Sequence, residues 1–178
     1  MKAVGLVTEY NPFHNGHIYH IQQAKAVTGA DVVIAVMSGN FVQRGEPALF
    51  DKWTRTQAAL ANGVDLVIEL PTFYAVQPSH LFAEGAIKLL TALGVEDVVF
   101  GSEHATVDFL NLAKQAPSVQ GGKAFQEKNQ TFAQAYATQL ESETGFKLED
   151  PNDILAFGYA KAILNLNSPI KLHAIQRV

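Results

Sequence analysis

Short runs of small and branched apolar residues recur along the chain and predict β-strands. Five such runs stand out, at residues 3–7, 31–37, 65–70, 95–100 and 170–175. Each run is mostly continuous rather than alternating, which is typical of a strand with both faces buried. The second run ends at Ser38-Gly39-Asn40, and the third is stopped by Pro71. The pattern therefore indicates the strands of a parallel sheet that is covered on both sides.

Between these runs the apolar period changes to that of amphipathic helices. Residues 16–27 carry apolar side chains at Ile18, Ile21, Ala24 and Val27, which predicts a helix with one buried face. Further helices are predicted at residues 54–61, 80–93, 106–113, 132–140 and 153–164. Alternating strands and helices favour parallel strands joined by right-handed crossovers. The predicted fold is α/β, a doubly wound, Rossmann-like open parallel sheet that binds ligands beyond the carboxyl ends of its strands.

One connection is longer than a single crossover requires. Residues 101–151 lie between the fourth strand and the last helix, and they predict a helical insertion at about residues 102–150. Gly121-Gly122 within this stretch predicts a loop rather than a domain boundary. The 178 residues, 1–178, are therefore interpreted as a single domain.

Composition narrows the functional classes. The chain has no cysteine, which excludes disulfides and thiolate metal sites. A formal net charge of -4 excludes a domain that attracts nucleic acid by its overall charge. No apolar run approaches the roughly 20 residues of a membrane helix, and the start of the chain lacks the layout of a secretory signal. We expect a cytoplasmic protein without a membrane partner.

The residues between the first strand and the first helix carry the candidate chemistry. This stretch ends in His14-Asn15-Gly16-His17, where the free N–H groups of a helix start favour a phosphate. His14 and His17 would point the same way, and Gly16 leaves room for a nucleotide to approach the backbone. Two imidazole donors can stabilise the charge that develops during attack at phosphorus.

A metal site is the alternative interpretation of the same helix. His14, His17 and His20 recur at every third residue, as metal ligands can. However, no carboxylate lies at ligand spacing within this helix, and its start favours an anion. The sequence therefore predicts no metal ligand here, and it leaves open whether His20 contacts a nucleotide or only packs.

The histidine motif resembles the HxGH signature of the nucleotidyltransferase superfamily, which includes class I aminoacyl-tRNA synthetases. The longer stretch at residues 5–17 resembles the bacterial tRNA(Met) cytidine acetate ligase family more specifically. Further matches to that family lie at residues 38–48, 69–71, 100–103 and 151–156. Together the matches span nearly the whole chain.

The resemblance implies a reaction and a site. The family activates acetate with ATP, giving acetyl-adenylate and pyrophosphate, and transfers the acetyl group to N4 of the wobble cytidine of elongator tRNA(Met). His14 and His17 would be catalytic, and Mg²⁺ is expected to accompany the nucleotide. The implied ATP-binding residues are Val7, Thr8, Glu9, Tyr10, Asn11, Pro12, Phe13, His14, Asn15, Gly16, His17, His20, Gly101, Asn152 and Arg177.

Three of these positions also have an ordinary structural interpretation. Gly101 can be a turn glycine, Asn152 a helix N-cap, and Arg177 a solvated residue near the end of the chain. Lys52 and Arg55, beside Trp53, could bind phosphate or RNA, but a solvated helix face is the favoured interpretation. Arg44, next to the turn at Gly45, is a better candidate for a phosphate contact than Lys52 or Arg55. For Asp51, Glu69 and Glu103 the sequence establishes no paired acid–base geometry.

The chain also departs from the superfamily pattern. We find no late Ser/Thr-rich segment that would form the second phosphate-binding signature. The sequence therefore predicts an N-terminal part of a longer protein, and tRNA binding would need the missing C-terminal part. Two other classes stay open: an adenylyltransferase that acts on another small metabolite, and a non-catalytic nucleotide- or RNA-binding module.

Overall fold

A five-stranded parallel sheet forms the centre of the computed structural model, which describes residues 1–117, 119 and 132–177. Its strand order is β3-β2-β1-β4-β5, and every neighbouring pair is parallel. The strands are β1 (Ala3–Thr8), β2 (Val32–Ser38), β3 (Leu66–Leu70), β4 (Asp97–Ser102) and β5 (Lys171–Gln176). The five predicted strands and the predicted doubly wound α/β fold are confirmed.

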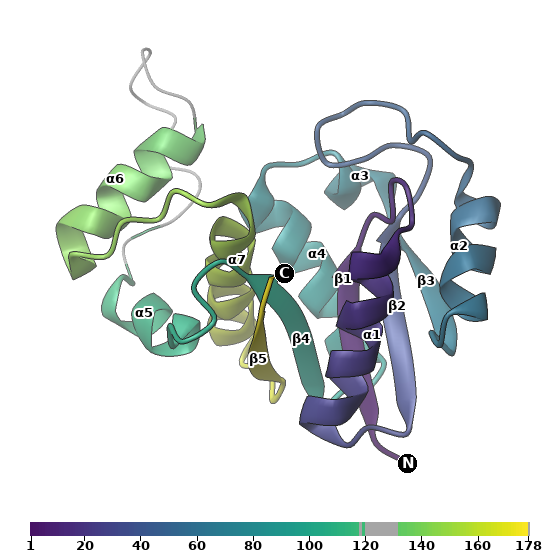
Figure 1. The fold of residues 1–178 in the computed structure, drawn as a ribbon. Coiled ribbons are helices and arrows are strands. Elements are labelled where there is room, and N and C mark those ends of the chain that lie inside the picture. Colours follow the sequence, from purple (N-terminus) through teal and green to yellow (C-terminus); the bar gives the residue numbers. More distant parts are fainter. Residues whose placement is uncertain (118, 120–131, 178) are drawn as a thin grey trace.

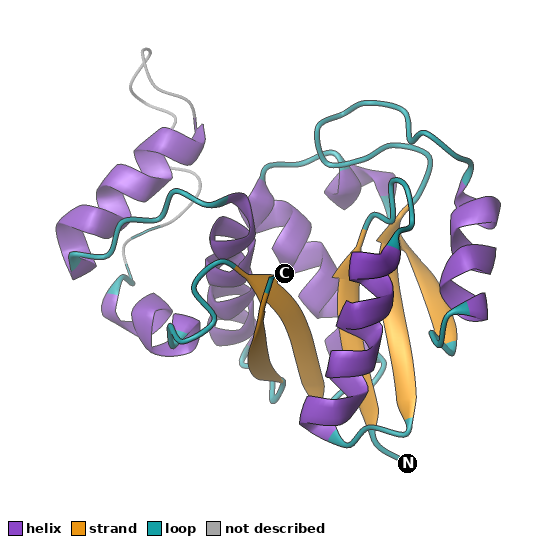
Figure 2. Ribbon diagram, viewed as in Figure 1, coloured by secondary structure: helices purple, strands orange, loops and turns teal. Residues whose placement is uncertain are grey.

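Helices cover both faces of this sheet (Figures 1 and 2). The helices of the described chain are α1 (Asn15–Thr28), α2 (Lys52–Ala61), α3 (Thr72–Ala75), α4 (Ser79–Ala92), α5 (Phe109–Gln115), α6 (Phe132–Thr144) and α7 (Pro151–Leu166). Consecutive strand residues point to opposite faces, so Val33 of β2 packs in the core on the α1 and α2 side. Ile34 packs in the larger core formed with α4, α5 and α7. Both faces of the sheet are therefore covered by packed side chains, as the continuous apolar runs predict.

The strand order reverses between β1 and β4. From β1 the chain proceeds outward through β2 and β3, and it then crosses back to β4 and β5 on the other side of β1. Because all strands are parallel, their carboxyl ends meet at one edge of the sheet. The loops that follow β1 and β4 thus diverge at this switch point, where doubly wound sheets bind their ligands.

The long connection between β4 and α7 contains α5 and α6. Lys161 of α7 is buried, and its ammonium group donates hydrogen bonds to the backbone carbonyls of Ala116 (3.0 Å) and Pro117 (3.3 Å). This contact ties the end of α5 to α7. The predicted Gly121-Gly122 loop lies outside the described residues.

The helix bounds differ from the predicted ones mainly at their starts. α2 begins at Lys52 because the Asp51 carboxylate accepts hydrogen bonds from the N–H groups of Trp53 (2.9 Å) and Thr54 (3.0 Å). α3 was not predicted, since four residues are too few for a helical period. Among the described helices, none is both long and apolar enough to span a bilayer.

Candidate active site

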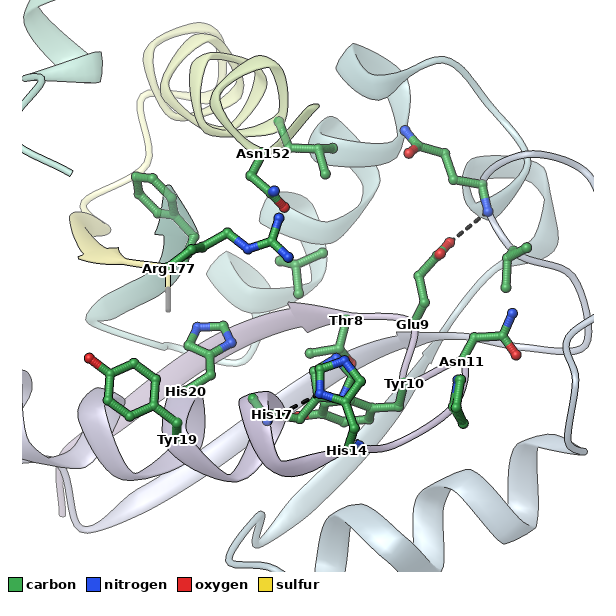
Figure 3. A pocket seen from close by; sticks show the side chains of 18 of the residues that line it. Thr8, Glu9, Tyr10, Asn11, His14, His17, Tyr19, His20, Asn152 and Arg177 are labelled. Carbon is green, nitrogen blue, oxygen red and sulfur yellow. Dashed lines mark hydrogen bonds between the residues drawn. The ribbon is translucent and has the colours of Figure 1, made fainter. Parts of the chain in front are cut away.

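A cavity of about 900 Å³ opens at the carboxyl edge of the sheet, at the switch point between β1 and β4. Figure 3 shows many of the side chains that line it, with Glu9, His14, His17, Asn152 and Arg177 among those labelled. All residues of the predicted nucleotide site line this cavity except Phe13. The remaining lining residues are Tyr19, Val42, Gln43, Arg44, Glu46, Phe82, Phe100, Leu155, Tyr159, Ile175 and Gln176. The size is within the range of small-molecule sites.

His14 and His17 form the start of α1 themselves. His14 is the N-cap residue, and its Nδ1 accepts a hydrogen bond from the Gly16 N–H (3.1 Å). In return, the His14 N–H donates to Nδ1 of His17 (3.2 Å). This arrangement is a capping box built from two imidazoles instead of the usual hydroxyl and carboxylate.

The capping box decides which ring nitrogens remain for a ligand. Both Nδ1 atoms accept backbone N–H groups, so in the neutral rings the proton is carried by Nε2. The two rings stack with 3.8 Å between their centroids, and His14 is exposed. His14 and His17 therefore present two neighbouring N–H donors at the positive end of a helix, an arrangement suited to phosphate oxygens.

The aromatic rings of Tyr10 and Phe13 pack against His17. The Tyr10 ring meets His17 edge-on at 4.9 Å, and Phe13 lies 5.5 Å from His17. Tyr10 is almost fully buried and has a positive φ of 50°, which turns the chain sharply after β1. Phe13, the one predicted residue outside the cavity lining, thus contacts the site through His17 and Tyr10.

Burial, together with the nearby His14, His20 and Arg177, lowers the pKa of His17 to about 4. A histidine in the unfolded chain titrates near pH 6.5. Protons therefore bind the unfolded chain more readily, and the stability that neutral His17 contributes is fully present above about pH 6.5. It is lost as the pH falls toward about 4.

We expect the free energy of unfolding of the wild-type chain to fall more steeply between these pH values than that of a His17→Gln variant. Urea titrations at a series of pH values measure both slopes. Equal slopes would show that His17 titrates as freely in the folded chain as in the unfolded one.

Two hydrogen bonds join the loop after β1 to the loop after β2. Oε1 of Glu9 accepts from the Gln43 N–H (2.6 Å), and Oδ1 of Asn11 accepts from the Leu49 N–H (2.7 Å). Burial raises the pKa of Glu9, while the Gln43 hydrogen bond and the nearby Arg55 and Arg44 oppose this shift. The loop after β2 thereby brings Arg44 to the cavity, in line with the phosphate role considered from the sequence.

Arg55 corrects one interpretation drawn from the sequence. The expected solvated helix face is wrong for this residue, which is only 1% exposed. Its guanidinium donates to the backbone carbonyls of Glu9, Ser38 (3.1 Å), Gly39 and Phe50 (3.0 Å). Arg55 thus joins the carboxyl ends of β1 and β2 beneath the cavity. Lys52 instead pairs with Glu69 (2.6 Å), and Trp53 is exposed.

The far side of the cavity is formed by β4, β5 and α7. Gly101 lies within β4 and pairs with Ile175 of β5, so the turn-glycine interpretation is wrong. The N-cap of α7 is Asp150, and Asn152 is a helical residue, so the N-cap interpretation is wrong as well. Arg177 is partly exposed, but it is ion-paired with Glu103 rather than fully solvated (3.0 Å).

His20 packs against the sheet and also lines the cavity, so contact with a nucleotide stays a prediction. Its Nε2 donates to the carbonyl of Val99 on β4 (3.0 Å), and its ring lines the cavity. Burial lowers the pKa of His20. Its ring therefore packs α1 against the sheet while one edge faces the cavity.

The described residues do not place His14, His17 and His20 together as a metal-ligand cluster. The group that meets this geometry within the described part of the chain is His104, Asp150 and Asp153, and none of these lines the cavity. Asp153 is already engaged, because its carboxylate accepts from the Ser102 hydroxyl and the Glu103 N–H and pairs with His104. This group ties the end of β4 to the start of α7.

The apolar part of the cavity wall is not predicted by the sequence. Phe82, Phe100 and Tyr159 come from α4, β4 and α7. Phe100 starts a stretch that resembles the ligase family, but no local motif marks Phe82 or Tyr159. Their apolar periodicity predicts burial but not which buried residues border a cavity. Gln43 also lines the cavity, and it likewise lies in a stretch that resembles the ligase family.

Comparison with known proteins places the chain. It matches the family model of the HIGH nucleotidyltransferases over residues 1–178, and it belongs to that family. It is 74% identical over 177 residues to the tRNA(Met) cytidine acetate ligase of Leuconostoc mesenteroides, covering 99% of this chain and 45% of that protein. The ligase of Oenococcus oeni is 58% identical, with 100% and 48% covered. The resemblance inferred from the sequence is confirmed.

Solved structures agree with these relatives. A Thermotoga maritima TmcAL structure bound with alpha-thio ATP is 42% identical and superposes with a TM-score of 0.87, covering 100% of this chain and 47% of that chain. The apo form of the same protein gives a TM-score of 0.86. The chain spans about half the length of the curated relatives that it matches.

Proposed function

We propose that the protein to which this chain belongs activates acetate with ATP and transfers the acetyl group to N4 of the wobble cytidine of elongator tRNA(Met). The observation that carries the proposal is the 74% identity to a tRNA(Met) cytidine acetate ligase over 99% of this chain. The stacked His14 and His17 donors at the start of α1 supply matching chemistry.

In the first half-reaction, a carboxylate oxygen of acetate attacks the α-phosphorus of ATP. The bond to the bridging oxygen of pyrophosphate breaks, and pyrophosphate leaves with the electron pair. Acetate is already ionised at neutral pH, so this step needs no general base. The Nε2–H groups of His14 and His17 stabilise the negative charge that develops on the phosphate oxygens.

The second half-reaction consumes the acetyl-adenylate. The N4 amine of cytidine attacks the acetyl carbonyl, AMP leaves, and N4 loses a proton. Because this domain carries a net charge of -4, the tRNA would be bound largely by the rest of the protein. Such a reaction belongs in the cytoplasm, where ATP and tRNA are available.

The nucleotide would lie across the cavity from α1 to β5. Its phosphates would bind at the start of α1, and its nucleoside would lie near Gly101, Asn152 and Arg177. Mg²⁺ would enter with the phosphates, which usually supply part of its coordination. Glu9 and Glu46 are the carboxylates that line the cavity, so they are the side chains able to complete that coordination.

Acetylation of tRNA tests the proposal. The full-length protein, supplied with ATP, acetate and elongator tRNA(Met), is expected to form N4-acetylcytidine at the wobble position, as detected by nucleoside mass spectrometry. The matched control is the same tRNA with uridine at that position, which has no N4 amine. Nucleotide turnover with no acetylcytidine would contradict the proposal and favour another adenylyl acceptor.

A further inference from the structure

Glu103 lies outside the lining of the cavity, yet it holds two residues that line it. Its Oε1 accepts a hydrogen bond from Nδ2 of Asn152 (2.6 Å) and from Nη1 of Arg177 (3.0 Å). Asn152 belongs to α7, and Arg177 follows β5. One carboxylate oxygen therefore joins two elements that are distant in the sequence.

This contact fixes the orientation of the Asn152 amide. A carboxylate oxygen can only accept, so the amide group that faces Glu103 must be the NH₂ group. The Oδ1 atom of Asn152 is left as the group available to a ligand in the cavity. Without Glu103, the amide would be free to present either its donor or its acceptor.

The same contact restrains Arg177. One of its terminal nitrogens is bonded to Glu103, which leaves the other donors of the fork for a ligand. The aliphatic part of Arg177 crosses Gly101, where an added Cβ would lie 3.1 Å from Cγ of Arg177. Figure 3 shows Asn152 and Arg177 reaching the cavity on the side away from His14 and His17.

Glu103 is itself held firmly. Its N–H donates to Oδ1 of Asp153 (3.1 Å), and its carbonyl accepts from Nε2 of Gln176 (3.1 Å). Its second carboxylate oxygen, Oε2, is shielded from solvent and has no hydrogen-bond partner within the described residues. A shielded acceptor of this kind is destabilising.

We propose that Glu103 is a positioning residue for the nucleoside part of ATP. It presents Oδ1 of Asn152 as an acceptor and the free N–H groups of Arg177 as donors on the side of the cavity away from the phosphate site. The inference rests on the proposed function, because it requires ATP in this cavity. It assigns Glu103 no contact with the phosphates.

Binding of two probes to the full-length protein tests the inference. ATP reports on the whole site, and inorganic tripolyphosphate reports on the phosphate part alone. Glu103→Ala is expected to weaken ATP binding about tenfold and not to weaken tripolyphosphate binding, as measured by calorimetry. Glu103→Gln retains one acceptor oxygen, so its affinity for ATP is expected to lie between those of the wild type and Glu103→Ala. In a protein that already carries Asn152→Ala, adding Glu103→Ala is expected to weaken ATP binding less than it does in the wild type.

Glu96→Ala is the matched control, because Glu96 is an exposed residue at the opposite end of β4. Unchanged ATP binding by Glu103→Ala would overturn the inference and leave the proposed function intact. Equal weakening of both probes would overturn it too, since that result indicates a general disturbance of the fold. Absence of ATP binding by the wild-type protein would instead contradict the proposed function.

Discussion

Replacing His17 by Ala in the full-length protein is expected to slow acetate-dependent formation of AMP from ATP by about 10²–10³-fold, as for the loss of one oxyanion donor. The variant loses the Nε2–H group that faces the cavity, and it also loses the Nδ1 acceptor of the His14 N–H. The remaining imidazole cannot by itself present paired donors. The rate of AMP release under saturating ATP, acetate and elongator tRNA(Met), the acceptor that frees AMP from the acetyl-adenylate, measures the effect.

Gln22→Ala provides the control for this variant. Gln22 lies on the same helix, is exposed and does not line the cavity. Its replacement should leave the rate within about twofold, since surface substitutions usually have small effects. A His17→Ala enzyme as fast as the Gln22→Ala enzyme would exclude the histidine from the chemistry.

Replacing Arg55 by Ala is expected to lower the free energy of unfolding by about 3–5 kcal/mol. The change removes a large buried side chain and leaves the carbonyls of Glu9, Ser38, Gly39 and Phe50 without their donor. Chemical denaturation of the chain measures the loss. Arg55→Lys is expected to be destabilising as well, because an ammonium group cannot reproduce the planar fork of donors.

Lys52→Ala is the matched control for Arg55→Ala. Lys52 is also a cation of α2, but it forms a partly exposed ion pair with Glu69. Its replacement should cost only about 0–1 kcal/mol. If Arg55→Ala were equally mild, the four carbonyls would have to find other donors, and Arg55 would not hold the strand ends together.

The fold could be predicted because its determinants are local. Each strand is a continuous apolar run, and each long helix has its own apolar stripe, so the order of elements follows from the sequence. The start of α1 was predictable for the same reason, since His14, Gly16 and His17 interact within one helical turn.

The roles of Arg55 and Glu103 depend on contacts that no local pattern encodes. Arg55 bonds to Glu9, 46 residues away, and Glu103 bonds to Arg177, 74 residues away. A charged residue among polar neighbours is typical of a helix surface, which is why Arg55 was interpreted as solvated. Arg55 is buried because the carboxyl ends of β1 and β2 lie side by side around it, and they do so only in the folded chain.

The N-terminus of α7 is an intermediate case. Asp150 and Asn152 are both good capping residues, so composition alone does not choose between them. Proline favours the first helical position, and Pro151 occupies it. This preference selects Asp150 as the cap and leaves the Asn152 side chain for Glu103 and the cavity.

Acetate-dependent exchange of labelled pyrophosphate into ATP tests most directly whether this cavity activates acetate. The full-length protein is expected to catalyse exchange only when acetate is present. His17→Ala is expected to lower the exchange rate to about 1% of the wild-type rate or less. Exchange without acetate, or exchange that survives in His17→Ala, would contradict the account of the site. Bound ATP with no exchange under any condition would contradict acetate activation itself.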